Sequence, residues 1–242
     1  MTAPSSADLV QSWALTAAPA HVRIVALLTV IDGPVATSRS LGGHNRRVLE
    51  LHQDCVGSVL DALATCPRCG DENEFAIPAA PIVELPDAVE VVEIHAADGV
   101  AAFRIPTVED VLATRGTGFV EAVRVLARRT GLSPGSDELD EAGLDELATA
   151  WADGDPAAAI TVDFRCVRCA AVITTAVDPV EFVARGLDGL VHRLIAEVHT
   201  LGSAYGWTED EILNLPEARR RRYVQLVSER PVGTATKSGA GR

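Results

Sequence analysis

The chain has 242 residues, of which 48% are hydrophobic and 23% are charged, so it is long enough to bury one sizeable core or two small ones. Its formal net charge of −13 argues against a protein that coats nucleic acid, because such a surface needs an excess of basic residues. We therefore expect a protein partner, and neither nucleic acid nor a small-molecule substrate.

The sequence predicts a protein that is neither secreted nor inserted in a membrane. The longest apolar run, Val22 to Ile31, contains Arg23 and is much shorter than the roughly 20 residues that a membrane-spanning helix needs. The start, MTAPSSADLVQSW, lacks the basic residues and apolar core of a secretory signal. We expect the protein in the cytoplasm, where its five cysteines stay reduced.

Residues 1–65 are predicted to form a helical N-terminal part. A helix can place Leu9, Val10 and Trp13 on one side, whereas residues 22–31 fit a buried strand as well as a helix. Further on, apolar residues recur with the spacing of one helix face: Val48, Leu51, Cys55, Val59 and Leu63. This pattern predicts an amphipathic helix that runs into the first cysteine pair.

Residues 66–106 are predicted to contain that cysteine pair and β hairpins. The segments NEFAI, AVEVVEIHA and GVAAFRIP have the composition of strands, and the Asp98-Gly99 pair favours a tight turn between the last two.

Residues 107–158 are predicted to form a helical insertion. Thr107 and Asp110 have the spacing of a capping box, and FVEAVRVLARR continues with helical periodicity. The stretch from Ser136 to Pro156 holds eight carboxylates and no Lys or Arg, which is typical of a helix with one solvated acidic face.

The rest of the chain is predicted to form a second cysteine-containing hairpin at residues 159–177, C-terminal helices at 178–230 and a disordered tail at 231–242. Asp178 suits a helix cap and Pro179 a first helical position. The predicted fold class is α+β, with helical N- and C-terminal parts around a small zinc-ribbon-like antiparallel β unit. Apart from the two cysteine-containing hairpins, the sequence shows no internal repeat.

Two Cys-x-x-Cys pairs are the main functional signal. Cys66 and Cys69 lie in CPRCG, Cys166 and Cys169 lie in CVRCA, and each pair adjoins strand-like sequence, as the knuckles of a zinc ribbon do. Four thiolates complete the tetrahedral shell of Zn²⁺ and leave no position for a catalytic water, so the pattern predicts one structural zinc ion and no enzymatic activity. The alternatives are a redox-active pair and cysteines that hold no metal.

Several segments follow one another in a recognisable order: LVQSW, VRIVALL, LGGHNRRVLEL, CPRCGDENEF, AFRIPTVEDVL, CVRC and LIAEVHTLGSAYGWTEDEILNLPEARRRRYVQLV. In this order they resemble the family of T-even-type phage baseplate hub assembly proteins, which has relatives in phages and in phage-tail-like contractile injection systems. The resemblance covers roughly Ala7 to Val227 and is most specific in the C-terminal block. It implies a non-catalytic, chaperone-like assembly protein or a minor structural component of the baseplate, with baseplate or hub proteins as partners.

The C-terminal block also predicts a partner-binding surface, because Tyr, Trp and Arg dominate the energetics of interfaces. The candidate residues are Tyr205, Trp207, Arg219, Arg220 and Tyr223. The same block can instead be scaffold, with its arginines paired to Glu209–Glu211. The alternative function is a zinc-ribbon module that binds nucleic acid or serves in transcription.

Overall fold

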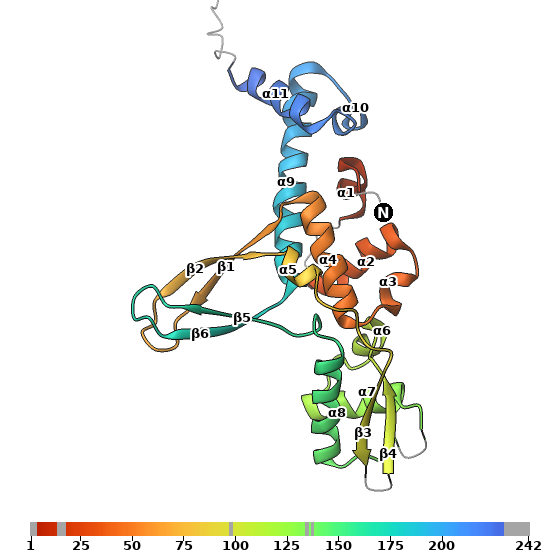
Figure 1. The fold of residues 1–242 in the computed structure, drawn as a ribbon. Coiled ribbons are helices and arrows are strands. Elements are labelled where there is room, and N and C mark those ends of the chain that lie inside the picture. The colour runs from red at the N-terminus through yellow and green to blue at the C-terminus, as the bar shows by residue number, and fades with distance from the viewer. Residues whose placement is uncertain (1–3, 14–17, 97–98, 134–135, 137, 230–242) are drawn as a thin grey trace, which may run out of the picture. The chain divides into compact units, whose positions relative to one another are not determined.

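The computed structural model describes residues 4–13, 18–96, 99–133, 136 and 138–229, and it combines helices with three antiparallel strand pairs (Figure 1). The predicted α+β class is confirmed, because helices flank the strand pairs along the chain. The helices are α1 (Ser6–Ser12), α2 (Ala20–Asp32), α3 (Val35–Ser38), α4 (Leu41–Cys55), α5 (Ala80–Val83), α6 (Val108–Leu112), α7 (Phe119–Thr130), α8 (Glu141–Gly154), α9 (Pro179–Tyr205), α10 (Glu209–Leu213) and α11 (Glu217–Ser228). The strands are β1 (Val59–Thr65), β2 (Glu72–Pro78), β3 (Val91–Ala96), β4 (Gly99–Arg104), β5 (Ile160–Arg165) and β6 (Val172–Val177).

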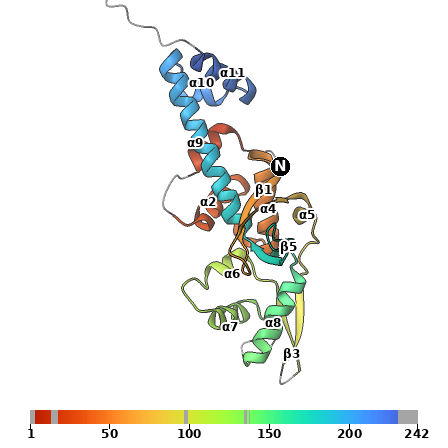
Figure 2. The same ribbon diagram turned by 90° about the vertical axis from the view of Figure 1, so that its left-hand side faces the viewer.

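The chain divides into two compact units, and the division falls inside α9. One unit includes Leu15–Leu187, and the other combines Pro4–Ala14 with Asp188–Arg242. Within the second unit, α10 and α11 lie beside the C-terminal half of α9 (Figures 1 and 2). The predicted disordered tail, residues 231–242, lies outside the described residues. In the part of the chain that the structure describes, no helix is both long enough and apolar enough to cross a membrane.

The region around residues 22–31, for which the sequence allowed either a strand or a helix, forms α2. Ile24, Leu27 and Leu28 are fully buried on one side of this helix, which is the spacing of an amphipathic surface helix. Gly33 follows with a φ of 73° and ends it, since this left-handed conformation favours glycine.

Residues 59–65 form a strand, so the prediction of a helix that continues into the first cysteine pair is wrong. Helix α4 ends at Cys55, and β1 pairs with β2 in a register that runs from Val59↔Pro78 to Thr65↔Glu72. Leu60 and Ala62 are buried while their neighbours along β1 are exposed, which is the alternation of a half-buried strand. The segment belongs to the first hairpin and not to the helical N-terminal part.

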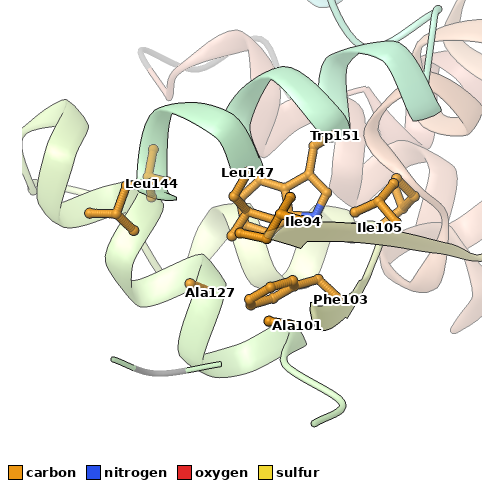
Figure 3. Close-up of a cluster of buried hydrophobic side chains, with 10 residues drawn as sticks. Ile94, Ala101, Phe103, Ile105, Ala127, Leu144, Leu147 and Trp151 are labelled. Atoms are coloured by element: carbon orange, nitrogen blue, oxygen red, sulfur yellow. The ribbon is translucent and has the colours of Figure 1, made fainter. Parts of the chain in front are cut away.

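Strands β3 and β4 form the predicted second strand pair and carry a separate hydrophobic cluster (Figure 3). Phe103 lies edge-on to Trp151 of α8, with ring centroids 6.3 Å apart. The indole nitrogen of Trp151 donates a hydrogen bond to the carbonyl oxygen of Arg104 at 3.2 Å. Leu144 and Leu147 point from α8 into the same cluster, so α8 buries its leucines and exposes the carboxylates within its span. Asp155, just after the helix, is instead 2% exposed and accepts a hydrogen bond from the N–H of Gly42 at 2.7 Å.

The predicted cysteine-containing hairpin at residues 159–177 is confirmed as β5 and β6, with α9 directly after it. β5 pairs with β6 from Ile160↔Val177 to Arg165↔Val172. The Asp178 carboxylate accepts hydrogen bonds from the N–H groups of Val180 and Glu181, which caps α9 as the sequence predicted.

The order of elements repeats once within the chain, although the sequence shows no repeat beyond the cysteine pairs. The first series is α1, α2, α4, β1 and β2, and the second is α6, α7, α8, β5 and β6. The four-residue helix α3 has no counterpart in the second series, and α5, β3 and β4 lie between the two series. The first helix of each series begins with a capping box, made by Ser5 with Asp8 and by Thr107 with Asp110. A repeated pattern of caps therefore marks two corresponding series of elements.

The correspondence continues through the long helix and the hairpin of each series. At the start of α4, Ser40 accepts a hydrogen bond from the N–H of Gly43 at 3.0 Å. At the start of α8, Asp140 accepts one from the N–H of Gly143 at 2.9 Å. Ser40 and Asp140 are 100 positions apart in the sequence, and so are Cys66 and Cys166. Each series therefore contributes one cysteine pair at the same place in its order of elements.

Candidate metal centre

The two cysteine pairs meet in one cluster. The sulfur of Cys66 lies 3.7 Å from that of Cys169, and the sulfur of Cys69 lies 3.6 Å from that of Cys166. All four sulfur atoms lie within 4.8 Å of one another. Because metal–sulfur bonds of about 2.3 Å in a tetrahedral shell place the sulfurs about 3.8 Å apart, the cluster has the size that one metal ion needs.

Each cysteine pair sits in a tight turn at the tip of its hairpin, and the two turns use the same hydrogen bonds. The N–H of Cys66 donates to Asp71 O at 2.8 Å, and the N–H of Gly70 donates to Cys66 O at 2.9 Å. In the second turn, the N–H groups of Cys166 and Ala170 make the corresponding bonds, to Ala171 O and Cys166 O, both at 2.9 Å. The backbone therefore presents both pairs in the same conformation.

The turns require a left-handed residue directly after the second cysteine. Gly70 takes this place with a φ of 74°, and Ala170 takes it with a φ of 55°. Ala170 is the one non-glycine residue with a positive φ among those that the structure describes. Since the Cβ atom disfavours this conformation, the second turn is the more strained of the two.

Asn73 joins the first hairpin to the second turn. Its side chain is 1% exposed, and its carbonyl oxygen accepts a hydrogen bond from the N–H of Val167 at 2.9 Å. Its amide nitrogen donates to Asp71 O at 2.9 Å. Ile173 occupies the corresponding position of the second hairpin and is buried against the cysteines, so only the first hairpin supplies this polar link. The sequence analysis missed Asn73, because one polar residue in a strand gives no signal of a partner 94 positions away.

The surroundings of the cysteines combine apolar packing with donors to sulfur. Cys66, Cys166 and Ile173 form a small buried cluster, and Phe75 stacks on Phe164 with ring centroids 4.2 Å apart. The backbone N–H groups of Cys169 and Arg168 donate hydrogen bonds to the sulfur of Cys166, and together with the neighbouring thiols of Cys69 and Cys66 they lower the pKa of the Cys166 thiol. A thiolate held in this way is the form that binds metal.

The arrangement can hold one ion that prefers soft ligands, because four sulfurs surround a single point. Four protein ligands complete a tetrahedral shell, so a bound ion has no free position for water. Such a site stabilises a fold by joining segments that are distant in the sequence.

Four of the five predicted partner-binding residues come together in the second unit. The ring of Tyr205 stacks on that of Trp207 with centroids 4.8 Å apart, and Tyr223 lies edge-on to Trp207 at 5.0 Å. The guanidinium of Arg219 lies over the ring of Tyr223 at 5.9 Å. All three aromatic residues are partly exposed.

Arg220 does not belong to this surface. It is 2% exposed, its Nε donates to the Glu197 carboxylate at 2.5 Å, and its Nη1 donates to Leu215 O at 3.1 Å. The predicted role of Arg220 as an exposed contact residue is therefore wrong. The internal acidic partner predicted for the arginines is also wrong, because Glu197 of α9, and not Glu209–Glu211, pairs with Arg220.

Comparisons of the chain with protein-family models, with curated proteins and with solved structures found no match in any of the three.

Proposed function

We propose that Cys66, Cys69, Cys166 and Cys169 hold one structural Zn²⁺ ion. The observation that carries this proposal is the approach of the two cysteine pairs to 3.6 and 3.7 Å, close to the sulfur separation of a tetrahedral zinc–thiolate shell. Zinc and iron both accept four thiolates, and zinc is the usual ion of paired Cys-x-x-Cys turns without open positions.

Metal analysis of the purified protein after extensive dialysis tests this proposal. We expect about one zinc ion and no iron per chain. The variants Cys66→Ser and Cys166→Ser should each lose the zinc ion. Cys55→Ser is the matched control: burial raises the pKa of the Cys55 thiol to about 11, and this residue lies outside the cluster. Iron in place of zinc, or full zinc content in Cys66→Ser, would overturn the proposal.

We further propose that the protein is a non-catalytic assembly protein, or a minor structural component, of the baseplate of a phage tail or a phage-tail-like contractile injection system. The support is the resemblance of the motif order, which is most specific in the C-terminal block. A zinc site without a free position agrees with a structural role, and reduced cysteines agree with the cytoplasm. The aromatic group of Tyr205, Trp207 and Tyr223, with Arg219, is the proposed contact with a baseplate or hub protein.

Co-expression with the products of the neighbouring genes tests this role. We expect the tagged chain to retain a hub or baseplate protein, and Trp207→Ala to reduce its recovery at least tenfold while zinc content stays unchanged. Phe119→Ala, which removes a 72% exposed aromatic side chain from the other unit, is the control. Neighbouring genes that encode no tail components, or full recovery with Trp207→Ala, would contradict this proposal.

Binding of nucleic acid is the second candidate, and one observation favours it. Arg68, Arg165 and Arg168 are exposed around the two cysteine turns, although Asp71 lies 3.5 Å from Arg168. Titration of the zinc-loaded protein with fluorescent single- and double-stranded DNA at two salt concentrations separates the candidates. Salt-sensitive binding that is lost in Arg68→Glu/Arg168→Glu would favour nucleic acid over the baseplate role.

A further inference from the structure

The two cysteine hairpins, β1–β2 and β5–β6, share one pairing register. Each residue pair of β5 and β6 has its counterpart 100 positions earlier in β1 and β2, as Ile160↔Val177 has in Leu60↔Ile77. These four residues are all buried. The hairpins are therefore two copies of one structural unit, and the offset of 100 positions identifies equivalent residues.

The cysteine cluster has approximate two-fold symmetry. An exchange of the two hairpins converts the contact of Cys66 with Cys169 into that of Cys166 with Cys69, and the two sulfur–sulfur distances are 3.7 and 3.6 Å. The two cysteine turns also make the same backbone hydrogen bonds. Because a two-fold axis relates each contact between two halves to a second one, every contact on one side of the cluster has an equivalent position on the other side.

The hydrogen bond of Asn73 breaks this symmetry. The side-chain oxygen of Asn73 accepts it from the backbone N–H of Val167 at 2.9 Å, and the equivalent position joins Ile173 to Pro67. Proline has no backbone N–H. Ile173 is 3% exposed and packs with Cys66, which directly precedes Pro67. An acceptor therefore meets a donor on one side of the axis, whereas on the other side an apolar side chain lies next to a residue without a donor.

Each side is matched in itself, because a change of one residue alone leaves a polar group unpaired. An amide at position 173 has no backbone donor at Pro67, and an N–H at position 67 has no acceptor at Ile173. A buried polar group without a partner costs free energy, which two paired polar groups or two apolar groups avoid. Replacing both residues therefore creates a second link, whereas replacing either one does not.

The aromatic contact between the hairpins lies on the same side as the Asn73 link. Phe75 of β2 stacks on Phe164 of β5 with ring centroids 4.2 Å apart, and Asn73 also belongs to β2. The residues equivalent to the two rings are Thr175 and Ala64, which are small. Both the polar link and the ring stacking therefore hold the two hairpins together from one side of the axis.

We propose that the metal site is a two-fold symmetric centre with a polar link on one side only, and that Pro67 and Ile173 occupy the place of a second link. Asn73, Pro67 and Ile173 are positioning residues and not ligands, because such links determine how firmly the two cysteine turns are held around an ion. The inference rests on the proposed metal site and adds the residues that set how long the ion is retained.

Moving the link from one side of the axis to the other tests the proposal. Asn73→Leu removes the existing link and should lose zinc to a chelator at least about tenfold faster than the unaltered chain. Asn73→Leu/Pro67→Val/Ile173→Asn carries the link on the other side, and its rate should return to within about threefold of the unaltered rate. Valine fits position 67, because Val167 has the equivalent place in the second turn.

Two matched controls carry one half of the new link each. Asn73→Leu/Ile173→Asn has the amide without the donor, and Asn73→Leu/Pro67→Val has the donor without the acceptor. Both should lose zinc at least as fast as Asn73→Leu, with circular dichroism to compare the folds. In the chain that keeps Asn73, Pro67→Val/Ile173→Asn should retain zinc longer than Ile173→Asn alone, and this pair decides the question if the triple variant does not fold.

The proposal is overturned if the folded triple variant loses zinc as fast as Asn73→Leu, if either control recovers, or if Pro67→Val does not slow zinc loss from Ile173→Asn. The midpoints of urea denaturation should follow the same order of variants, because the hydrogen bond forms without metal. An unaltered chain that holds no zinc contradicts the proposed metal site, whereas the urea midpoints still support or overturn the second link.

Discussion

The side-chain carbonyl of Asn73 accepts a hydrogen bond from the backbone N–H of Val167 at 2.9 Å and thereby ties the first hairpin to the second cysteine turn. This link needs no metal ion, and neither does the stacking of Phe75 on Phe164 between the same two hairpins. The Asn73 bond is the one that lies directly at the second cysteine turn, and it adds a neutral hydrogen bond to the apolar packing beside the ligand cluster.

Replacing Asn73 is expected to weaken metal binding as well as the fold. Asn73→Leu leaves the N–H of Val167 without its acceptor, which costs about 1–3 kcal/mol, and neighbours of metal ligands typically change metal affinity by about 10–100-fold. We expect zinc loss to a chelator to become at least tenfold faster, followed with a zinc-sensitive dye. Asn214→Leu, at an exposed asparagine, is the control. Equal rates in the two variants would show that the Asn73 link does not position the site.

Gly70 and Ala170 have left-handed backbone conformations in the two cysteine turns, and substitutions at these two positions should change the stability of the protein in opposite directions. Ala170→Gly should raise the free energy of unfolding by about 0.5–1 kcal/mol, because it relieves the strain at a φ of 55°. Gly70→Ala should lower it by about 1 kcal/mol, and this cost is conformational because no atom lies within 4 Å of the added Cβ. Urea denaturation of the zinc-loaded proteins measures both, and a destabilised Ala170→Gly variant would contradict the assignment of strain.

The buried carboxylate of Asp110 predicts a loss of stability in acid. Burial alone would raise the pKa of Asp110, but hydrogen bonds from Arg104, Thr107 and Arg129 outweigh it and lower the pKa well below its usual value. A lowered pKa in the folded state stabilises the protein above the unfolded pKa of about 3.9, and this contribution disappears as the pH falls below that value.

Asp110→Asn should therefore be less stable than the unaltered chain at pH 7, by about 2 kcal/mol or more, because hydrogen bonds to a charged group are lost. The difference should shrink as the pH falls from about 4 to 2. Urea denaturation at pH 7, 5 and 3 follows it. Glu109→Gln, at the exposed neighbouring residue, is the control and should show little effect. A difference that does not change with pH would exclude the charge of Asp110 as its cause.

The meeting of the cysteine pairs could be predicted from the sequence, because their spacing and the adjoining strands indicate one site. Strand β1 could not be predicted, because Val59 and Leu63 stand four positions apart and continue the helical spacing of apolar residues in α4. The alternation of Leu60 and Ala62 over seven residues is a weaker signal than a helical stripe. The repeated order of elements was missed for a related reason: the caps that mark it are made by different residues in the two series, such as Ser40 and Asp140.

The buried ion pair of Arg220 shows a further limit, and it supplies the last prediction. Four consecutive arginines suggested an exposed basic cluster, yet Arg220 is enclosed by α9, where Glu197 lies 23 positions earlier in the sequence.

Arg220→Met leaves the Glu197 carboxylate buried without its partner, and we expect the second unit to lose about 3–5 kcal/mol of its free energy of unfolding. Arg219→Met, which removes an exposed guanidinium from the same helix, should change it by less than about 1 kcal/mol. Replacing the pair together, as Arg220→Met/Glu197→Leu, should restore most of the loss, because no charge then remains buried. Thermal unfolding followed by tryptophan fluorescence and by calorimetry compares the three variants, since Trp13 and Trp207 report on this unit. If the double variant is no more stable than Arg220→Met, the loss comes from the packing of the arginine stem and not from the unpaired carboxylate; if Arg220→Met is as mild as Arg219→Met, the ion pair does not hold α11 on α9.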